Sequence, residues 1–120
     1  MAKHNETGQT GEVLALELLQ EKGYQILETN WRYRRLEVDI IAMDGDTLVF
    51  VEVKTRTFDY HGRPEEFVDD QKMRFLQKAG QAYMQQINHD WAIRFDVVAV
   101  QMKSVNGLEI KHLEDAFFPW

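Results

Sequence analysis

The chain has 120 residues, with 14 Lys+Arg against 20 Asp+Glu and a formal net charge of −6. Its length and its 44% hydrophobic residues suit one buried core, so we expect a single domain. The absence of cysteine excludes a disulfide framework, a Cys-ligated zinc or iron–sulfur site and a thiol nucleophile, and it fits a cytoplasmic location. No apolar run approaches a membrane span, and the acidic balance argues against an indiscriminate nucleic-acid binder.

The first third of the chain predicts a helix followed by a strand. The opening ten residues are polar and carry no secretory h-region, and we expect residues 1–7 to be disordered. Apolar side chains then recur at helical spacing over residues 8–22, and Gly23 offers a left-handed stop. Residues 24–33 follow as a strand.

The rest of the chain predicts a hairpin, a helix and further strands. Residues 36–43 and 47–56 are strands around the turn Asp44-Gly45-Asp46, and residues 58–68 are a loop. Asp69 or Asp70 can cap a second helix that runs to Asn88. Residues 92–100 form a strand, and residues 108–112 form a weaker one. The order α-β-β-β-α-β indicates an α/β (α+β) fold with a central mixed sheet flanked by helices.

The hairpin gathers charge at the end away from its turn. Alternation gives each strand one wholly apolar face, which should pack on a helix. The other faces carry, at that end, Glu37, Asp39, Glu52 and Lys54. A turn with an even number of residues places Asp39 and Glu52 on the same face, whereas an odd turn without a bulge separates them. Because the all-valine face of the strand at residues 47–56 needs an apolar partner, we expect the three carboxylates and the lysine to cluster.

Clustered carboxylates repel one another unless a cation or a proton lies between them. Lys54 supplies one positive charge against three negative ones, so a divalent ion would supply the remainder. An all-oxygen donor set favours Mg²⁺ or Mn²⁺ over zinc. Such an ion suits phosphodiester hydrolysis, in which Lys54 positions the water or stabilises the transition state. The Val53 carbonyl is a further candidate ligand.

The pattern Glu37-Val38-Asp39, a turn, then Glu52-Val53-Lys54 resembles the metal site of the PD-(D/E)XK nuclease superfamily, with its restriction-endonuclease-like fold. More closely, the chain resembles the small bacterial YraN family of predicted endonucleases, over residues 10–117. The shared stretches are Gly11-Glu12, Gly23-Tyr24, Asn30-Trp31-Arg32, residues 37–42, residues 46–56 and residues 94–98. The resemblance implies that Asp39 and Glu52 are metal ligands, that Lys54 is catalytic, and that Glu12 completes the metal site, as the helical glutamate does in archaeal Holliday-junction resolvases.

The sequence departs from the family pattern at two positions, and two of the site assignments have simpler structural alternatives. Val38 replaces the proline of the superfamily's name, and Leu36 stands where the closer family usually has glycine. Glu12 also lies in a first helical turn, where the helix dipole alone favours an acid. The alternative for the central group is a structural salt bridge, although two acids for each lysine leave one acid unpaired. Glu37 is better placed as a residue supporting the site than as a ligand.

Charge is unevenly distributed along the chain. Residues 31–64 hold six basic and six acidic residues, whereas residues 1–30 and 65–120 each carry a net charge of −3. A metal bound by the site carboxylates would leave the middle segment locally positive, which suits phosphate contact. The candidate nucleic-acid-binding residues are Arg32, Arg34, Arg35 and Arg56. A merely solvated arginine face is the alternative, and Trp31 and Tyr33 suit either base stacking or core packing.

The sequence therefore predicts a metal-dependent nuclease acting on DNA, including branched or repair intermediates. The alternative is a non-catalytic nucleic-acid-binding or adaptor module on the same fold. The apolar tail Phe117-Phe118-Pro119-Trp120 either folds back on the domain or contacts a second copy or a protein partner. The four histidines show no ligand spacing.

Overall fold

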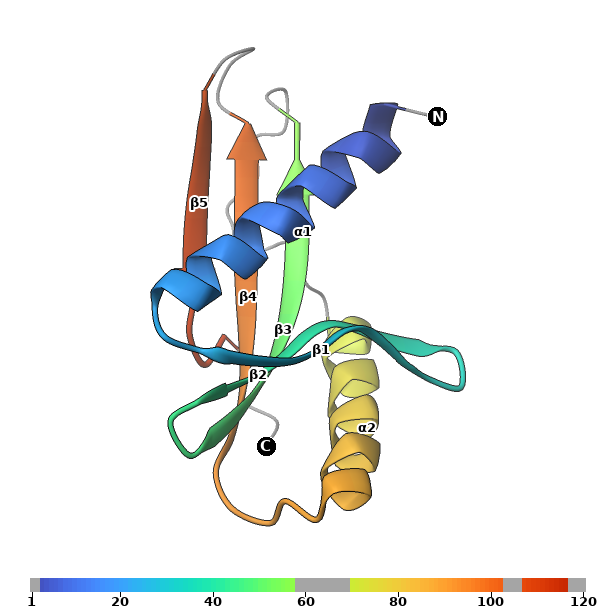
Figure 1. The fold of residues 1–120 in the computed structure, drawn as a ribbon. Helices are drawn as coiled ribbons and strands as arrows, with labels where there is room; N and C mark the ends of the chain where they lie inside the picture. Colours follow the sequence, from blue (N-terminus) through green and yellow to red (C-terminus); the bar gives the residue numbers. More distant parts are fainter. Residues whose placement is uncertain (1–2, 58–69, 103–106, 117–120) are drawn as a thin grey trace.

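A computed structural model describes residues 3–57, 70–102 and 107–116. Its elements are α1 (Lys3–Glu21), β1 (Gln25–Tyr33), β2 (Leu36–Asp44), β3 (Thr47–Arg56), α2 (Asp70–Ile87), β4 (Ile93–Met102) and β5 (Leu108–Leu113). Across these ranges the strands form one sheet in the order β1-β2-β3-β4-β5, in which β3 and β4 are parallel and the other neighbours antiparallel (Figure 1). The predicted mixed sheet is confirmed, and the weak last strand is present.

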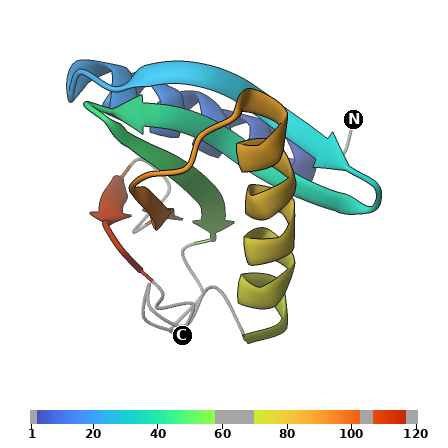
Figure 2. The same cartoon turned by 90° about the horizontal axis from the view of Figure 1, so that it is seen from below.

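The two helices cover opposite faces of the sheet (Figures 1 and 2). On the α1 side, Ala15 and Leu19 pack with the valines Val49, Val51 and Val98. On the α2 side, Leu76, Ala79 and Tyr83 pack with Leu48, Phe50 and Phe95. The central strand β3 thus contributes to both cores, and this explains its nearly continuous apolar sequence.

Local sequence signals place the helix ends. Gly23 has φ 89°, and its amide bonds the carbonyl of Gln20, so it ends α1 as predicted. Asn88, at φ 57°, ends α2 in the same way. The start of α1 differs from the prediction, because the helix begins at Lys3 and not at residue 8.

The β2–β3 hairpin settles the register on which the site depends. Asp44 pairs with Thr47, so the turn is the two-residue Gly45-Asp46, with Gly45 at φ 60°. A turn with an even number of residues is the case that places Asp39 and Glu52 together. The strand pairing runs from this turn as far as Ile40 opposite Val51.

One predicted face is wrong. Alternation assigns Val38 to the same apolar face as Ile40 and Ala42, but Val38 belongs to the core on the α2 side, and the other two belong to the core on the α1 side. The reason is that β2 pairs with β3 only as far as Ile40 and continues toward its start against β1 alone. The strict two-residue period holds only along a continuous ladder.

Two predictions fall outside the described residues. The loop at residues 58–68 and the apolar tail at residues 117–120 both lie there. In the parts of the chain that are described, neither helix is long and apolar enough to cross a membrane.

Candidate active site

Asp39 is fixed where the β2–β3 ladder opens. Its Oδ2 accepts a hydrogen bond of 2.8 Å from the backbone amide of Val53, two residues beyond the last strand pair. Burial raises the pKa of Asp39, although the Val53 amide and the charge of Lys72 act in the opposite direction. The backbone amide holds the carboxylate in place. Because burial disfavours its negative charge, a bound cation would stabilise the charged form.

Glu52 is the most confined acid of the site. Its side chain is 4% exposed; Lys54 Nζ lies 3.5 Å from Oε1, and Lys72 Nζ lies 3.4 Å from Oε2. Despite that approach, Oε2 is buried without an aligned hydrogen bond. Burial, together with the charge of Asp39, raises the pKa of Glu52 to about 7, against the pull of the two lysines.

Glu12 reaches the same region from α1. Glu12 and Asp39 line one pocket of about 350 Å³, together with Asn30 and apolar side chains of α1 and β2. Burial raises the pKa of Glu12, and the nearby charges of Asp39 and Glu37 add to this effect, while a hydrogen bond with Asn30 opposes it. The structure therefore brings Glu12, Asp39 and Glu52 into one electrostatically coupled group.

Gly11 sets how closely α1 approaches β3 beside Glu12. A Cβ atom at Gly11 would collide with the hydroxyl of Thr55, so the absence of a side chain there is required by the packing. This contact anchors the helix one residue before Glu12 and one residue after Lys54. It explains how a helical acid comes to face the hairpin.

Glu37 does not join Lys54 in the cluster. It forms an ion pair of 3.0 Å with Arg32, and its charge contributes to the raised pKa values of Glu12 and Asp39. Its position matches a supporting residue rather than a ligand. The structure thus brings Asp39, Glu52 and Lys54 of the predicted group together, adds Lys72 beside Glu52, and places Glu12 and Glu37 near enough to Asp39 to act on its charge.

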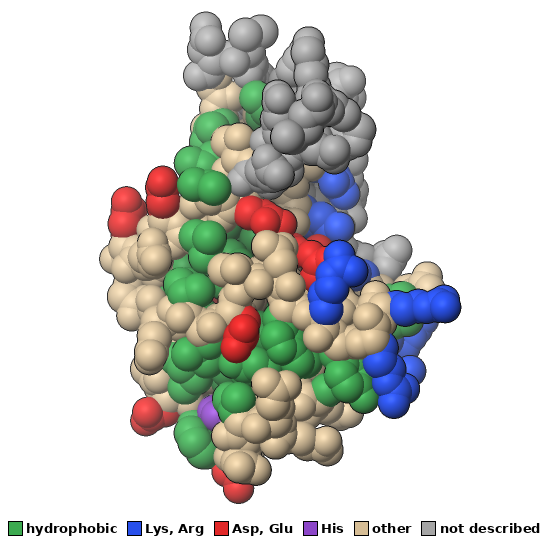
Figure 3. Space-filling view, turned by 45° about the vertical axis from the view of Figure 1, so that its right-hand side comes forward, with side chains coloured by type: hydrophobic (Ala, Val, Ile, Leu, Met, Phe, Trp, Pro, Cys, Tyr) green, Lys and Arg blue, Asp and Glu red, His purple; other side chains and the backbone are tan. Residues whose placement is uncertain are grey.

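The predicted arginines lie at two places. Arg32, Arg34 and Arg35 are exposed at the tip of the β1–β2 hairpin. Arg56 lies at the end of β3, where it donates a hydrogen bond to the carbonyl of Thr55. In the view of Figure 3, basic side chains gather along the right-hand edge of the molecule, beside a group of acidic side chains.

Sequence reasoning missed Lys72. The helical pattern of α2 places it near the polar side, but only the packing of α2 against the sheet brings it to Glu52. Asn30, which bonds Glu12, was also missed. Asn30 has a left-handed backbone with φ 50°, a conformation that asparagine adopts more readily than most residues.

The donor set fits a divalent ion only in part. Among the described residues, no three Asp, Glu or His side chains are gathered closely enough to form a complete metal site. The fit is instead with a two-carboxylate set, Asp39 and Glu52, together with the Val53 carbonyl. The buried Oε2 of Glu52 lies 3.4 Å from the Lys72 ammonium but accepts no aligned hydrogen bond, so a metal ion could bind it as well.

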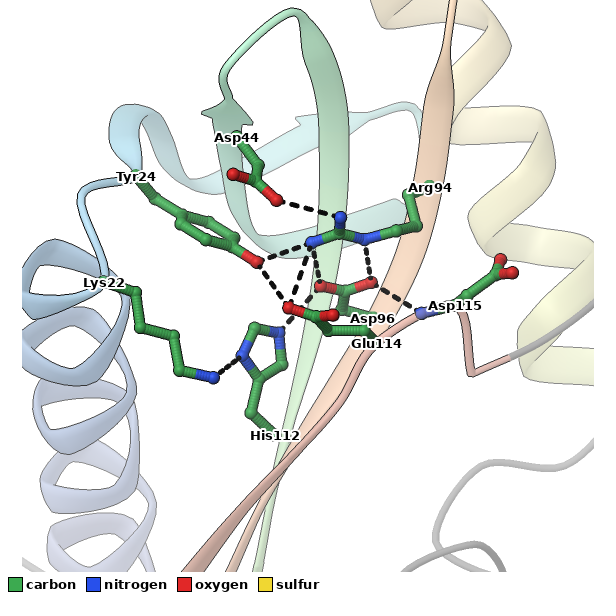
Figure 4. A network of polar contacts seen from close by, with 8 residues as sticks. All are labelled: Lys22, Tyr24, Asp44, Arg94, Asp96, His112, Glu114 and Asp115. Carbon is green, nitrogen blue, oxygen red and sulfur yellow. Dashed lines mark hydrogen bonds and ion pairs between the residues drawn. The ribbon is translucent and has the colours of Figure 1, made fainter.

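A second polar cluster lies at the opposite end of α1 (Figure 4). Asp96, with no exposed surface, accepts two hydrogen bonds of 2.9 Å from Arg94, lies 2.7 Å from His112 Nε2 and accepts a bond from the Asp115 amide. Burial alone would raise the pKa of Asp96, but these partners lower it below its ordinary value. The cluster also includes Lys22, Tyr24, Asp44 and Glu114. It ties β2, β4 and β5 to the connection between α1 and β1 and to the segment after β5, and we assign it a structural role.

The mixed sheet with a helix on each face, and with Asp39, Glu52 and Lys54 where β2 and β3 diverge, has the architecture of a restriction-endonuclease-like core. The sequence profile described as "Uncharacterised protein family UPF0102" matches residues 11–100. The chain therefore belongs to UPF0102, which is the YraN family. The expected family membership is confirmed.

Relatives of similar length support this assignment. The UPF0102 protein of Christiangramia forsetii is 47% identical and aligned over 98% of each chain. The UPF0102 protein FP2501 of Flavobacterium psychrophilum is 48% identical over the same shares. The UPF0102 protein of Syntrophus aciditrophicus is 46% identical over 98% of this chain and 92% of its own. These matches cover the site residues and both helices.

Proposed function

We propose that this protein is a metal-dependent nuclease that hydrolyses phosphodiester bonds in DNA. The observation that carries the proposal is the environment of Glu52. It is a buried carboxylate beside a second acid, flanked by two lysines, and one of its oxygens lacks an aligned hydrogen bond. Burying such a group is costly, and strongly perturbed acids of this kind gather at functional sites.

In this proposal the acids bind the metal ion and the lysines act on the water and the phosphate. Asp39, Glu52 and the Val53 carbonyl would hold Mg²⁺ or Mn²⁺, with Glu12 beside them. When bound, the ion supplies charge neutralisation at the phosphate and a more acidic water. Lys54 lies 3.5 Å from Glu52, so its ammonium can donate to an attacking water or to a phosphate oxygen. Lys72 adds a second positive charge from the other side of Glu52.

The test is cleavage by the purified protein. Linear, branched and single-stranded DNA, and RNA of matched sequence, are incubated with Mg²⁺ or with Mn²⁺. We expect cleavage that chelation abolishes and that Glu52→Gln and Lys54→Gln each reduce by at least about a hundredfold. The exposed Lys111→Ala serves as the control of matched charge change and keeps its activity. Equal cleavage by wild type and both site variants would trace the activity to a contaminant, and no cleavage of any substrate would end the enzymatic proposal.

One observation favours a second candidate, a non-catalytic nucleic-acid-binding or adaptor module. Both lysines already pair with Glu52, so part of the charge is balanced without an ion. On this alternative, binding of nucleic acid is independent of metal and unaffected by Asp39→Asn. On the leading proposal, Asp39→Asn removes the dependence of binding on divalent ions. Titration of labelled DNA with and without Mg²⁺ separates the two.

A further inference from the structure

The β1–β2 hairpin ends in an exposed basic tip. Tyr33 pairs with Leu36, so Arg34-Arg35 is a two-residue turn, and Arg32 precedes it. All three arginines are exposed, and Arg32 is anchored through Glu37 at 3.0 Å. The hairpin projects past the rest of the sheet beside α2 (Figures 1 and 2). A tip of this charge is complementary to a phosphate backbone.

Flat side chains form a stack that leads out to this tip. The Trp31 and Tyr33 rings lie nearly parallel, with 6° between their planes and 6.3 Å between their centres. Trp31 is held at its inner side by the ring of Tyr83 on α2, 5.1 Å away at 80°. The guanidinium carbon of Arg34 lies 5.2 Å from the centre of the Tyr33 ring. The stack is therefore anchored in the core and ends in a planar cation.

The backbone at this position is strained. Arg34 has φ 59°, a left-handed conformation that glycine or asparagine adopts more readily than arginine. The conformation holds the guanidinium beside Tyr33. Strain of this kind persists where the surroundings impose it, and it is found at ligand-binding positions.

We propose that the tip formed by Trp31, Tyr33 and Arg34 is a stacking site for an unpaired nucleobase, so that the substrate of this protein is single-stranded or contains a single-stranded segment. This rests on the proposed action on nucleic acid. Aromatic rings and guanidinium planes stack on bases of any sequence. Bases inside a duplex already stack on their neighbours, so only an unpaired base can use such a surface. Arg32 and Arg35 contact the flanking phosphates.

The tip is separate from the proposed metal site. Tyr33 pairs with Leu36, which lies three residues before Asp39 on β2, or roughly 10 Å away at about 3.3 Å per residue, and Arg34 follows Tyr33 at the turn. Substitutions of Tyr33 and Arg34 therefore leave the site carboxylates in place. This makes the failure of the stacking proposal distinguishable from the failure of the nuclease proposal.

The experiment measures binding in a chelating buffer, where no cleavage occurs. Fluorescence anisotropy compares three labelled ligands of about 12 nucleotides: oligo-dT, an abasic strand of the same charge, and a duplex. We expect oligo-dT to bind roughly tenfold more tightly than the abasic strand. Arg34→Gly and Tyr33→Leu should bring this ratio close to one, while Lys111→Ala, which removes an exposed charge on β5, keeps it.

Arg34→Gly also separates binding from folding. Glycine suits φ 59°, so the variant should unfold at the same temperature as wild type or higher, and any loss of binding is then a loss of contact. Mn²⁺-induced thermal shifts should be unchanged in the tip variants. Equal affinity of wild type for the base-bearing and abasic strands, duplex binding as tight as single-strand binding, or an unchanged ratio in both tip variants would each overturn the proposal.

Discussion

The carboxylate of Asp39 accepts a hydrogen bond of 2.8 Å from the backbone amide of Val53. The bond lies just past the last β2–β3 pair, Ile40 with Val51, so a side chain takes over where the backbone ladder ends. It fixes one oxygen of Asp39 and brings the carboxylate next to the strand that carries Glu52 and Lys54. The relationship joins the fold to the proposed chemistry, because opening the ladder creates both the orphan amide and the space for a ligand.

This bond predicts different effects for two substitutions of Asp39. Asn keeps an oxygen that accepts from the Val53 amide, whereas Ala leaves that partly buried amide unsatisfied. We expect Asp39→Ala to lower the free energy of unfolding by about 1–2 kcal/mol relative to Asp39→Asn. Urea denaturation in chelating buffer measures the difference. Equal stability of the two variants would show that the bond contributes nothing to folding.

Glu52→Gln should stabilise the metal-free protein at high pH. The pKa of Glu52 is raised from 4.5 to about 7, so between these values the folded chain keeps a proton that the unfolded chain releases. Stability from this group is therefore lost as the pH rises from about 4.5 through about 7, and the loss is constant above that. We expect the variant to be more stable by ~2 kcal/mol at pH 8 and by much less at pH 4.

Thermal melts across this pH range, in chelating buffer, test the prediction. Exposed Glu17→Gln is the matched control and should show no such trend. A Glu52→Gln variant less stable than wild type at pH 8 would mean that the two lysine pairs outweigh the cost of burial. Added Mn²⁺ should stabilise the wild type by mass action and leave the Glu52→Gln variant unaffected.

Lys72 should matter more when Glu52 is charged. Its ammonium lies 3.4 Å from Glu52 Oε2 and lowers the pKa of that acid. We expect Lys72→Gln to cost ~0.5–1 kcal/mol at pH 8, since its side chain is 35% exposed and water screens the pair, and little at pH 5. The exposed Lys78→Gln on the same helix is the control.

A double-mutant cycle isolates the pair. In a Glu52→Gln background, Lys72→Gln should cost less at pH 8 than it does in the wild type, and the remaining cost reflects the attraction between Lys72 and Asp39. A cost in that background as large as in the wild type would show that Lys72 does not act through Glu52.

Gly11→Ala should destabilise the protein although alanine favours helices. A methyl group at Gly11 would collide with Thr55 Oγ1, and this contact outweighs a gain in helix propensity of about 1 kcal/mol. We expect a net loss of about 1–3 kcal/mol and a further loss of metal-dependent stabilisation, as Glu12 moves away from Asp39. Thr55→Ala removes the colliding hydroxyl and should restore most of the stability. If it does not, the close approach of α1 to β3 is set elsewhere.

The sequence predicts the parts of this fold that local rules govern. Gly23 ends α1 and Asp44-Gly45-Asp46 marks the hairpin turn, as the sequence predicts. The sequence leaves an even and an odd turn open, and the two-residue turn of the structure is the even case that groups Asp39 with Glu52. The misassigned face of Val38 arises because alternation assumes a ladder without interruption. The partner of Lys72 depends on how α2 packs, which no local pattern encodes. The buried Asp96–His112 pair needs the register of β4 with β5, and nothing in the sequence marks residues 16 positions apart as neighbours.

That buried pair carries the last prediction, which concerns acid stability. Hydrogen bonds from His112, Arg94 and the Asp115 amide outweigh burial and lower the pKa of Asp96 below its unfolded value. The resulting stability is present above the unfolded pKa and is lost as the pH falls through the folded one. Asp96→Asn should therefore cost about 3–5 kcal/mol at pH 7, because it leaves Arg94 partly buried without its main partner, and the difference should shrink below about pH 4. Urea denaturation at pH 7 and pH 3 measures this difference, with the exposed Asp90→Asn as control. A penalty of equal size at both pH values would show that Asp96 acts through its shape and neutral hydrogen bonds rather than through its charge.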